Sequence, residues 1–187
     1  MAINLKAIPK PAIEIPNQIF SVGPEIYQNR LKRLRQRMAE TGLDAIAIYA
    51  DREHSANFSY ITGFGPRFEE GLLILFPSGE PKVLLGPENL NMVKCSAIDL
   101  EAVFFPSFGL IGQPRTGSQS LRSIMRNAGL KQGMTVGTVG WKYYSEDDGC
   151  SADSIEIPHY LVEAFADATG DIRRVRNVTQ FFMSPVE

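Results

Sequence analysis

The densest group of side chains able to do chemistry is a stretch of aromatic, glycine and charged residues at positions 60–70. Within it, Arg67 is a permanent cation whose planar guanidinium suits a carboxylate. Phe64 and Phe68 would line an apolar pocket beside it. We favour the structural interpretation, in which both phenylalanines lie in the core and Arg67 pairs with one of the glutamates that follow it. Loops held by a rigid scaffold often carry binding residues, so this stretch is the first candidate site.

Carboxylates and histidines are the other groups that could support acid–base or metal chemistry. A dinuclear hydrolase site needs several carboxylates, commonly with a histidine, converging on one cavity. His54 and His159 fall on different expected elements, and neither has a carboxylate pattern beside it. We interpret His159, which follows Pro158, as a surface or capping residue. The candidate carboxylates are Asp51, Glu69, Glu70, Asp147 and Asp148.

The sequence contains none of the common catalytic or nucleotide-binding motifs. It has no phosphate-binding loop, no GxSxG and no HExxH. The Gly-x-Gly at 63–65 and the Gly-x-x-Gly at 137–140 do not form a dinucleotide fingerprint. Cys95 and Cys150 are far apart with no CxxC, and we interpret them as reduced thiols that pack in the fold. No catalytic residue is assigned to this chain.

Length and composition exclude several classes of protein. The chain has 187 residues, of which 44% are hydrophobic and 21% charged, with a formal charge of −2. Near-balanced charge argues against nucleic-acid binding through phosphate neutralisation. No apolar run reaches the ~18–20 residues of a membrane helix, and the N-terminus lacks a secretory signal. We therefore expect a cytoplasmic domain with no nucleic-acid or membrane partner.

Residues 24–41 are expected to form the first helix. Pro24 and Glu25 suit a helix start, and Gly42 suits its end. The apolar stripe consists of Tyr27, Leu31, Leu34 and Met38, which recur at helical spacing.

Five basic residues lie on the same helix: we place Arg30, Arg33 and Arg37 on the face opposite the apolar stripe, with the other two nearby. A basic face could bind an anion, but the charge balance favours a solvated surface. These residues are Arg30, Lys32, Arg33, Arg35 and Arg37.

The rest of the chain alternates strands with helices. The Pro77-Ser78-Gly79 turn joins two apolar segments into a β-hairpin, and small residues in 134–140 suggest that another element packs closely there. Strands are expected at 43–49, 71–76, 82–85, 101–105, 134–140 and 172–178. Further helices are expected at 55–62, at 87–97, after a Ser118 cap up to Gly129, and from Pro158 to Gly170. This order predicts an α/β domain with a mixed β-sheet and helices on its faces.

The first 23 residues are expected to be an N-terminal arm. Pro9, Pro11 and Pro16 prevent a regular helix and favour an extended chain. The arm would lie on the domain surface as a strap or reach a partner subunit, and we favour the strap.

Several segments together resemble one known family. Arg30–Arg35 leads through Met38–Ala45 into a strand, Asn57–Phe64 follows, and Gly71–Phe76 enters the Pro-Ser-Gly-Glu-Pro turn. Their order is similar to that of the N-terminal domain of the creatinase, prolidase and aminopeptidase P family, over about residues 25–180. The Tyr49–His54 stretch is similar to a less characterised branch.

This resemblance implies a ribonuclease-H-like α/β domain at 24–178, followed by a larger C-terminal pita-bread catalytic domain. In the peptidases that domain holds two divalent metals, often manganese, on two Asp, one His and two Glu. Creatinase-type members work without metal through a catalytic His. None of these residues can be placed in this chain, so the resemblance implies no cofactor here and places the metals in the catalytic domain.

The end of the chain resembles the junction between the two family domains. Ser184-Pro185-Val186-Glu187 has a cap, a proline and an early acid, which is typical of a helix start. We therefore expect residues 179–187 to begin a linker, and the chain to be a fragment that ends at a domain boundary.

The resemblance also suggests what the domain does. It implies a non-catalytic domain of a metal-dependent Xaa-Pro peptidase-like hydrolase, which shapes substrate access and supports a homodimer. The partners would be its own catalytic domain and a peptide or small amide substrate. The alternatives are a creatinase-like amidinohydrolase and a free-standing binding or assembly module. The substrate-gating candidates are Phe64, Arg67 and Phe68, followed by His54 and Tyr60.

Overall fold

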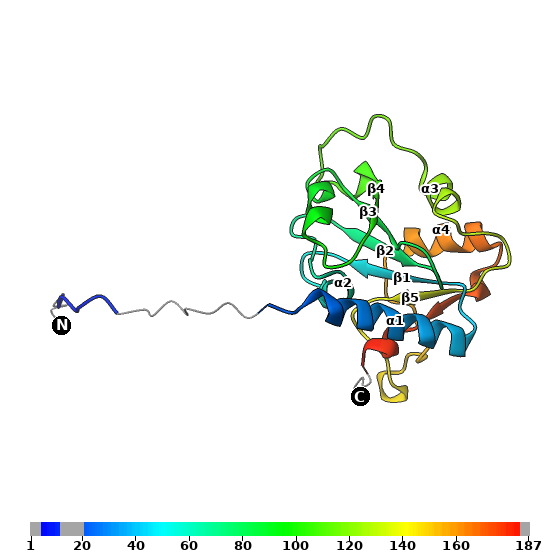
Figure 1. The fold of residues 1–187 in the computed structure, drawn as a ribbon, viewed down its shortest axis with the longest axis horizontal. Coiled ribbons are helices and arrows are strands. Elements are labelled where there is room, and N and C mark those ends of the chain that lie inside the picture. Colours follow the sequence, from blue (N-terminus) through cyan, green and yellow to red (C-terminus); the bar gives the residue numbers. More distant parts are fainter. Residues whose placement is uncertain (1–4, 12–20, 184–187) are drawn as a thin grey trace.

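The chain forms a six-stranded mixed sheet in the order β4-β3-β2-β1-β5-β6 (Figure 1). The computed structural model describes residues 5–11 and 21–183. Strand β1 pairs antiparallel with β2 and parallel with β5, and β2 pairs antiparallel with β3. The remaining neighbours are parallel. The strands are β1 (Ala45–Ala50), β2 (Gly71–Leu75), β3 (Lys82–Leu85), β4 (Glu101–Phe104), β5 (Val136–Val139) and β6 (Val175–Asn177).

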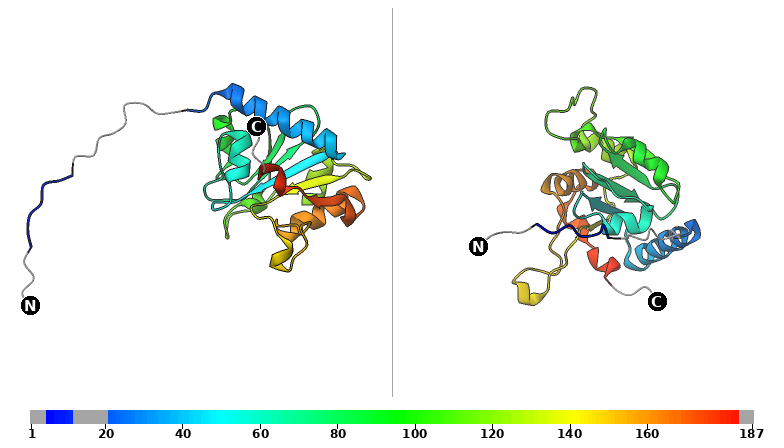
Figure 2. Two further views of the ribbon diagram at one scale, coloured as in Figure 1. Left: turned by 90° about the horizontal axis from the view of Figure 1, so that it is seen from below. Right: turned by 90° about the vertical axis from the view of Figure 1, so that its left-hand side faces the viewer.

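Helices cover both faces of the sheet, as the sequence predicts (Figure 2). On β1, Ala45, Ala47 and Tyr49 face the cluster that includes the two later helices. Ile46 and Ile48 face the opposite cluster, which contains residues of the two earlier helices. This alternation explains why the strand is apolar at every position. The helices are α1 (Pro24–Thr41), α2 (Ala56–Thr62), α3 (Leu121–Asn127) and α4 (His159–Thr169).

Most helix ends follow the local signals in the sequence. Gly42, Gly63 and Gly170 end their helices in the left-handed conformation, with φ of 67°, 83° and 82°. The predicted cap of α3 is wrong by two residues: the side chain of Ser120, not that of Ser118, accepts a hydrogen bond from the N–H of Ser123 at 3.2 Å. Ser118 lies in the preceding loop.

Two predicted elements are shorter than expected. The helix expected at 87–97 is a 3₁₀ segment, Leu90–Cys95. Of the strand expected at 172–178 only Val175–Asn177 pairs with β5, because the residues before it form a 3₁₀ turn, Ile172–Arg174. The prediction that both cysteines pack in the fold is also wrong, since Cys95 and Cys150 are exposed.

The arginines of α1 do not lie opposite its apolar stripe. Residues three and four apart share a helix face, so Arg30, Arg33 and Arg37 border Leu34 instead. Arg30 and Arg37 contact the 3₁₀ turn Thr179–Phe182 or α2, as described below, rather than solvent alone. On the other flank, Arg35 Nε donates to Phe76 O at 3.1 Å.

Both chain ends are only partly described. Residues 5–11 are exposed along their whole length and form no helix or strand, so this part of the expected arm does not pack on the domain as a strap. The remainder of the arm, 1–4 and 12–20, and the expected helix start at 184–187 lie outside the described residues. Within those described, no helix is long and apolar enough to cross a membrane.

Candidate functional site

The loop between α2 and β2, residues 63–70, is held to the domain at its first half by core packing. Gly63 donates its N–H to Ser59 O at 2.8 Å and ends α2. Phe64 is buried and packs edge-on against Phe58, with ring centroids 5.3 Å apart. Pro66 is also buried. These contacts place Phe64 in the core, so it supports the loop from beneath.

The second half of the loop is anchored by a buried carboxylate. Glu69 is 4% exposed, and its Oε2 accepts hydrogen bonds from the N–H groups of Glu88 at 3.0 Å and Asn89 at 3.1 Å. Burial raises the pKa of Glu69 above its usual range, and the two N–H donors partly oppose that rise. Glu69 therefore ties the loop to the segment that follows β3.

Glu70 ends the loop in a hydrogen-bonded cluster with two tyrosines. Its Oε1 accepts from the hydroxyl of Tyr49 at 2.7 Å and from that of Tyr160 at 3.0 Å. Burial and the adjacent carboxylate raise the pKa of both phenols far above the usual tyrosine range, so both remain proton donors. The cluster joins the end of β1 to α4 and fixes the loop where it enters β2.

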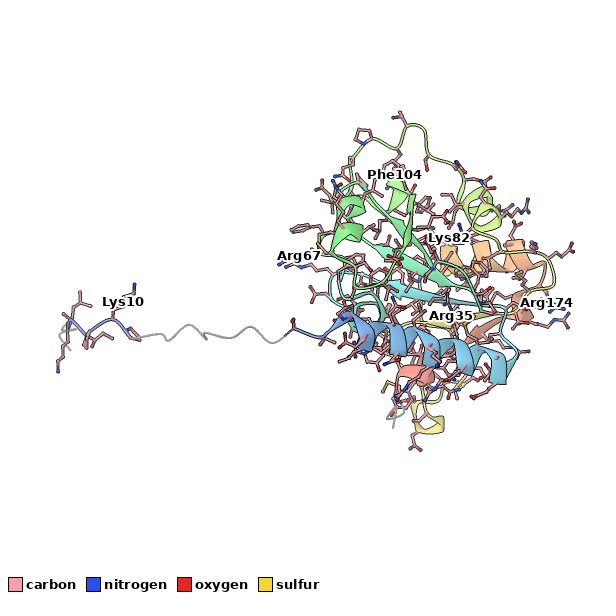
Figure 3. All side chains as sticks on the ribbon, viewed as in Figure 1. Lys10, Arg35, Arg67, Lys82, Phe104 and Arg174 are labelled. Carbon is pink, nitrogen blue, oxygen red and sulfur yellow. The ribbon has the colours of Figure 1, made fainter. Side chains whose placement is uncertain are left out.

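Arg67 and Phe68 project from the loop between these anchors. Phe68 is 61% exposed, and Arg67 is exposed and points away from the body of the domain (Figure 3). Among the residues that the structure describes, the Arg67 guanidinium has no hydrogen bond or ion pair. The expected alternative, pairing with Glu69 or Glu70, is not formed. Glu69 is buried and accepts from the N–H groups of Glu88 and Asn89, and Glu70 accepts from two tyrosine hydroxyls. A cation and an aromatic ring on a firmly held loop can together bind a carboxylate that carries an apolar group.

His54 lies in a separate cluster at the ends of β1 and β5. Its Nδ1 is 3.0 Å from Asp51 Oδ1, so a carboxylate does stand beside this histidine, contrary to the sequence interpretation. The imidazole stacks on Trp141 with centroids 4.1 Å apart, and Trp141 also lies 5.9 Å from Tyr49. Asp51 orients the ring by one nitrogen and leaves Nε2 without a hydrogen bond within the described part of the chain.

Tyr60 occupies a third setting, against α1. The guanidinium carbon of Arg30 lies 4.0 Å from the centroid of its ring, and the ring of Phe182 packs edge-on at 6.0 Å. The five sequence candidates therefore divide: Arg67 and Phe68 are exposed on one loop, Phe64 is in the core, and His54 and Tyr60 contact other residues.

The remaining charged candidates are engaged locally. Asp148 Oδ2 accepts from the N–H and hydroxyl of Ser145, and these hydrogen bonds lower the pKa of Asp148. His159 lies 3.7 Å from Glu163 on the exposed face of α4. Within residues 5–11 and 21–183, no three His, Cys, Asp or Glu side chains are grouped closely enough to hold a metal.

Sequence reasoning missed Trp141 and the two tyrosines around Glu70. A usable signal existed: Tyr49 ends one apolar strand and Trp141, the single tryptophan, follows another. Since β1 and β5 are parallel neighbours, their carboxyl ends meet at one edge of the sheet. Sequence alone did not show that these two strands are neighbours.

The buried Glu69 leads to a testable pH dependence. Because its folded pKa is raised, its contribution to stability is fully present below the ordinary glutamate pKa and is lost as pH rises through the folded value. We expect the free energy of unfolding of Glu69→Gln, relative to wild type, to increase with pH across this window. Urea titrations at a series of pH values measure it, with Glu53→Gln, an exposed carboxylate, as the control for net charge. A relative stability that stays constant or falls with pH would contradict the assignment.

Comparison with known proteins identifies a family model and several solved structures. The model described as the creatinase/prolidase N-terminal domain matches residues 30–178. A comparison with curated protein sequences gives no match.

The solved structures share the fold at low sequence identity. The creatinase/prolidase N-terminal domain of an X-Pro dipeptidase from Streptococcus pyogenes is 11% identical with a TM-score of 0.55, covering 83% of this chain and 97% of that one. Prolidase from Thermococcus sibiricus is 13% identical with a TM-score of 0.54, covering 82% and 35%. Dipeptidase PepE from Mycobacterium ulcerans is 16% identical with a TM-score of 0.52, covering 80% and 34%. The chain thus spans about a third of the two longer proteins.

Proposed function

The chain belongs to the creatinase/prolidase N-terminal domain family, and from this membership we propose that it is the non-catalytic domain of an Xaa-Pro peptidase-like hydrolase. The names of the similar structures, a prolidase and two dipeptidases, support a peptidase over an amidinohydrolase. In the whole protein, which would be a cytoplasmic homodimer, the domain limits access to a catalytic domain and contacts one end of the substrate.

The exposure of Arg67 on an anchored loop is the observation that carries this proposal. A guanidinium presents parallel N–H donors that match both oxygens of a carboxylate. Phe68 beside it offers an apolar surface for the adjoining substrate side chain. The anchors on either side, Phe64 and Glu69, reduce the ordering cost of binding because the loop is already fixed. The substrate class is therefore a short peptide with a free C-terminal carboxylate.

The two divalent metals implied by the family belong to the catalytic domain in this proposal. The described residues of this chain offer no group of three metal-ligating side chains, so they do not fit such a centre. Metal-assisted attack on the peptide bond is accordingly assigned to no residue here.

Substitution of Arg67 tests the substrate-contact role in the protein that carries both domains. We expect Arg67→Ala to raise KM for an Xaa-Pro dipeptide about tenfold with little change in kcat, since a charged hydrogen bond contributes roughly 1.5–3 kcal/mol. Arg122→Ala, an exposed arginine on α3, is the matched control. A dipeptide with an amidated C-terminus should not distinguish wild type from Arg67→Ala. Unchanged KM and kcat for the free acid would refute the role.

A second experiment tests whether this chain is non-catalytic. The 187-residue protein is incubated with Mn²⁺ and an Xaa-Pro peptide, and we expect no turnover above a blank containing the metal alone. Turnover above the blank would overturn the proposal. Reading the gene beyond Glu187 separates the alternatives: five metal ligands support the peptidase, a domain without them supports a creatinase-like enzyme, and a stop codon supports a free-standing module.

A further inference from the structure

A pocket of about 360 Å³ lies between α1, α2 and the 3₁₀ turn Thr179–Phe182. Its floor is apolar and includes Leu34 and Ile61, and its walls include Tyr60 and Phe182. The volume falls at the lower end of the ~300–1,000 Å³ range typical of small-molecule sites. The turn lies against α1 in the fold (Figure 1), and its Phe181 and Phe182 line the pocket.

Three arginines line this pocket, and among the residues that the structure describes no acidic side chain lines it. Arg30, Arg33 and Arg37 are three and four positions apart, so they project from one side of α1. The pocket near Glu70 differs, because its Arg115 and Arg122 are accompanied by Glu70 and Glu163. The two charges of each sign in that pocket give it no preference for an anion or a cation. The described charged residues that line the α1 pocket are all arginines, so its lining attracts anions.

Two of the arginines are held in place by aromatic rings and carbonyl groups. The Arg30 guanidinium stacks on Tyr60 at 4.0 Å and on Tyr27 at 4.9 Å, and it donates to Tyr60 O at 2.9 Å. Arg37 donates to Phe181 O and lies 5.8 Å from the Phe181 ring. In the described part of the chain neither guanidinium pairs with a carboxylate, so no described acidic group offsets their positive charge.

Arg33 stands between these two arginines on α1. It is exposed, and within the described residues it has no hydrogen bond and no ion pair. Three neighbouring cations repel one another, and an incoming anion would relieve that repulsion. The aromatic and aliphatic walls add a surface for an apolar group attached to that anion.

We propose that this pocket binds a small organic oxyanion, either a phosphate monoester or a carboxylate, whose apolar body packs against Tyr60 and Phe182. Arg33 supplies the free donors, and Arg30 and Arg37 supply fixed positive charge. The site is separate from the proposed substrate contact, because Arg67 and Phe68 are not among its lining residues. Failure of one proposal therefore leaves the other untouched.

The test is an NMR titration of the 187-residue chain with three probes of similar shape: phenyl phosphate, benzoate and uncharged phenol. We expect saturable shifts at Arg33 and Tyr60 with one or both anions, little response to phenol, and weaker binding as salt increases. A response to phenyl phosphate alone identifies a phosphate ester as the ligand class, and one to benzoate alone identifies a carboxylate. No saturable shift with either anion, or equal affinity for phenol, would overturn the proposal.

Variants locate the binding within the pocket. Arg33→Gln, which removes no hydrogen bond or ion pair of the described residues, should weaken binding of the anion at least tenfold. Arg37→Gln is a second variant with the same expected direction, while Arg122→Gln on α3 is the matched control and should bind as wild type. Equal affinity of wild type, Arg33→Gln and Arg37→Gln would also overturn the proposal, since the anion would then bind elsewhere.

Discussion

Replacing Phe58 with alanine is expected to lower the free energy of unfolding by about 3–5 kcal/mol, the usual cost of removing a buried aromatic ring. Phe58 has no exposed surface and belongs to α2, from which it packs into the core cluster shared with the sheet and α1. Its ring packs edge-on against Phe64, an aromatic contact that adds to the burial. The surrounding side chains come from a sheet and two helices, which cannot all move inward to fill the cavity.

The matched control is Phe68→Ala, the same chemical change at an exposed site on the α2–β2 loop. With 61% of Phe68 exposed, its removal should change the free energy of unfolding by less than about 0.5 kcal/mol. Urea titrations followed by circular dichroism give both values. Similar losses for the two variants would show that the loop side chain is packed as tightly as the core. A loss below about 1 kcal/mol for Phe58→Ala would contradict its placement.

Local sequence patterns predicted most of the fold because most of its elements are locally determined. The Pro77-Ser78-Gly79 turn sets the register of β2 against β3, and the observed pairing is antiparallel. Gly42 and Gly170 adopt the left-handed conformation that ends a helix, which few other residues tolerate. The apolar run 71–76 predicted a strand, and β2 (Gly71–Leu75) is buried at every position.

Contacts between segments that are far apart in the sequence were not predicted. The hydrogen bond from Tyr160 to Glu70 joins residues 90 positions apart, and the one from Asn57 to Gly140 joins residues 83 apart. Neither follows from periodicity, which identifies an element but not its neighbours. The sheet order, with β1 between β2 and β5, creates both contacts.

In the α2–β2 loop, the sequence likewise did not show which side chains are buried and which are exposed. Sequence left two interpretations of the α2–β2 loop, one functional and one structural, and the structure combines them. Phe64 is in the core while Phe68 is exposed, and Arg67 is unpaired within the described residues. The N–H groups of Glu88 and Asn89 donate hydrogen bonds to Glu69, which forms no ion pair with Arg67. They belong to the segment after β3, and local sequence spacing does not show that this segment lies beside the loop.

The second large effect is expected at Gly140, where Gly140→Ala should cost about 3 kcal/mol. An added Cβ would overlap the carbonyl oxygen of Glu156, a backbone atom that cannot rotate away. The small residues of the β5 segment predicted such a close approach, and Gly137 shows it too, with a Cβ position 2.7 Å from Val178 Cγ2. Gly140 also donates its N–H to Thr179 Oγ1 at 3.0 Å and accepts from Asn57 Nδ2 at 2.8 Å. A backbone shift that relieved the overlap would also disturb these two hydrogen bonds. We therefore place the loss of stability at the upper end of the 1–3 kcal/mol typical of overpacking, about 3 kcal/mol.

This substitution can be followed at the site itself because Trp141 is the only tryptophan. Trp141 follows Gly140 directly, donates its backbone N–H to Glu156 Oε2 at 2.9 Å and stacks on His54, so displacement of Glu156 should change its emission. Gly79→Ala is the control: its φ of 84° makes alanine strained there by about 1 kcal/mol, but no atom stands in the way of the new Cβ. If Gly140→Ala lost no more stability than Gly79→Ala and left the emission of Trp141 unchanged, the close approach of residues 140 and 156 would be wrong. A larger loss together with altered emission would instead show that one glycine holds the His54 cluster, the α2 start and the Thr179–Phe182 turn in a common arrangement.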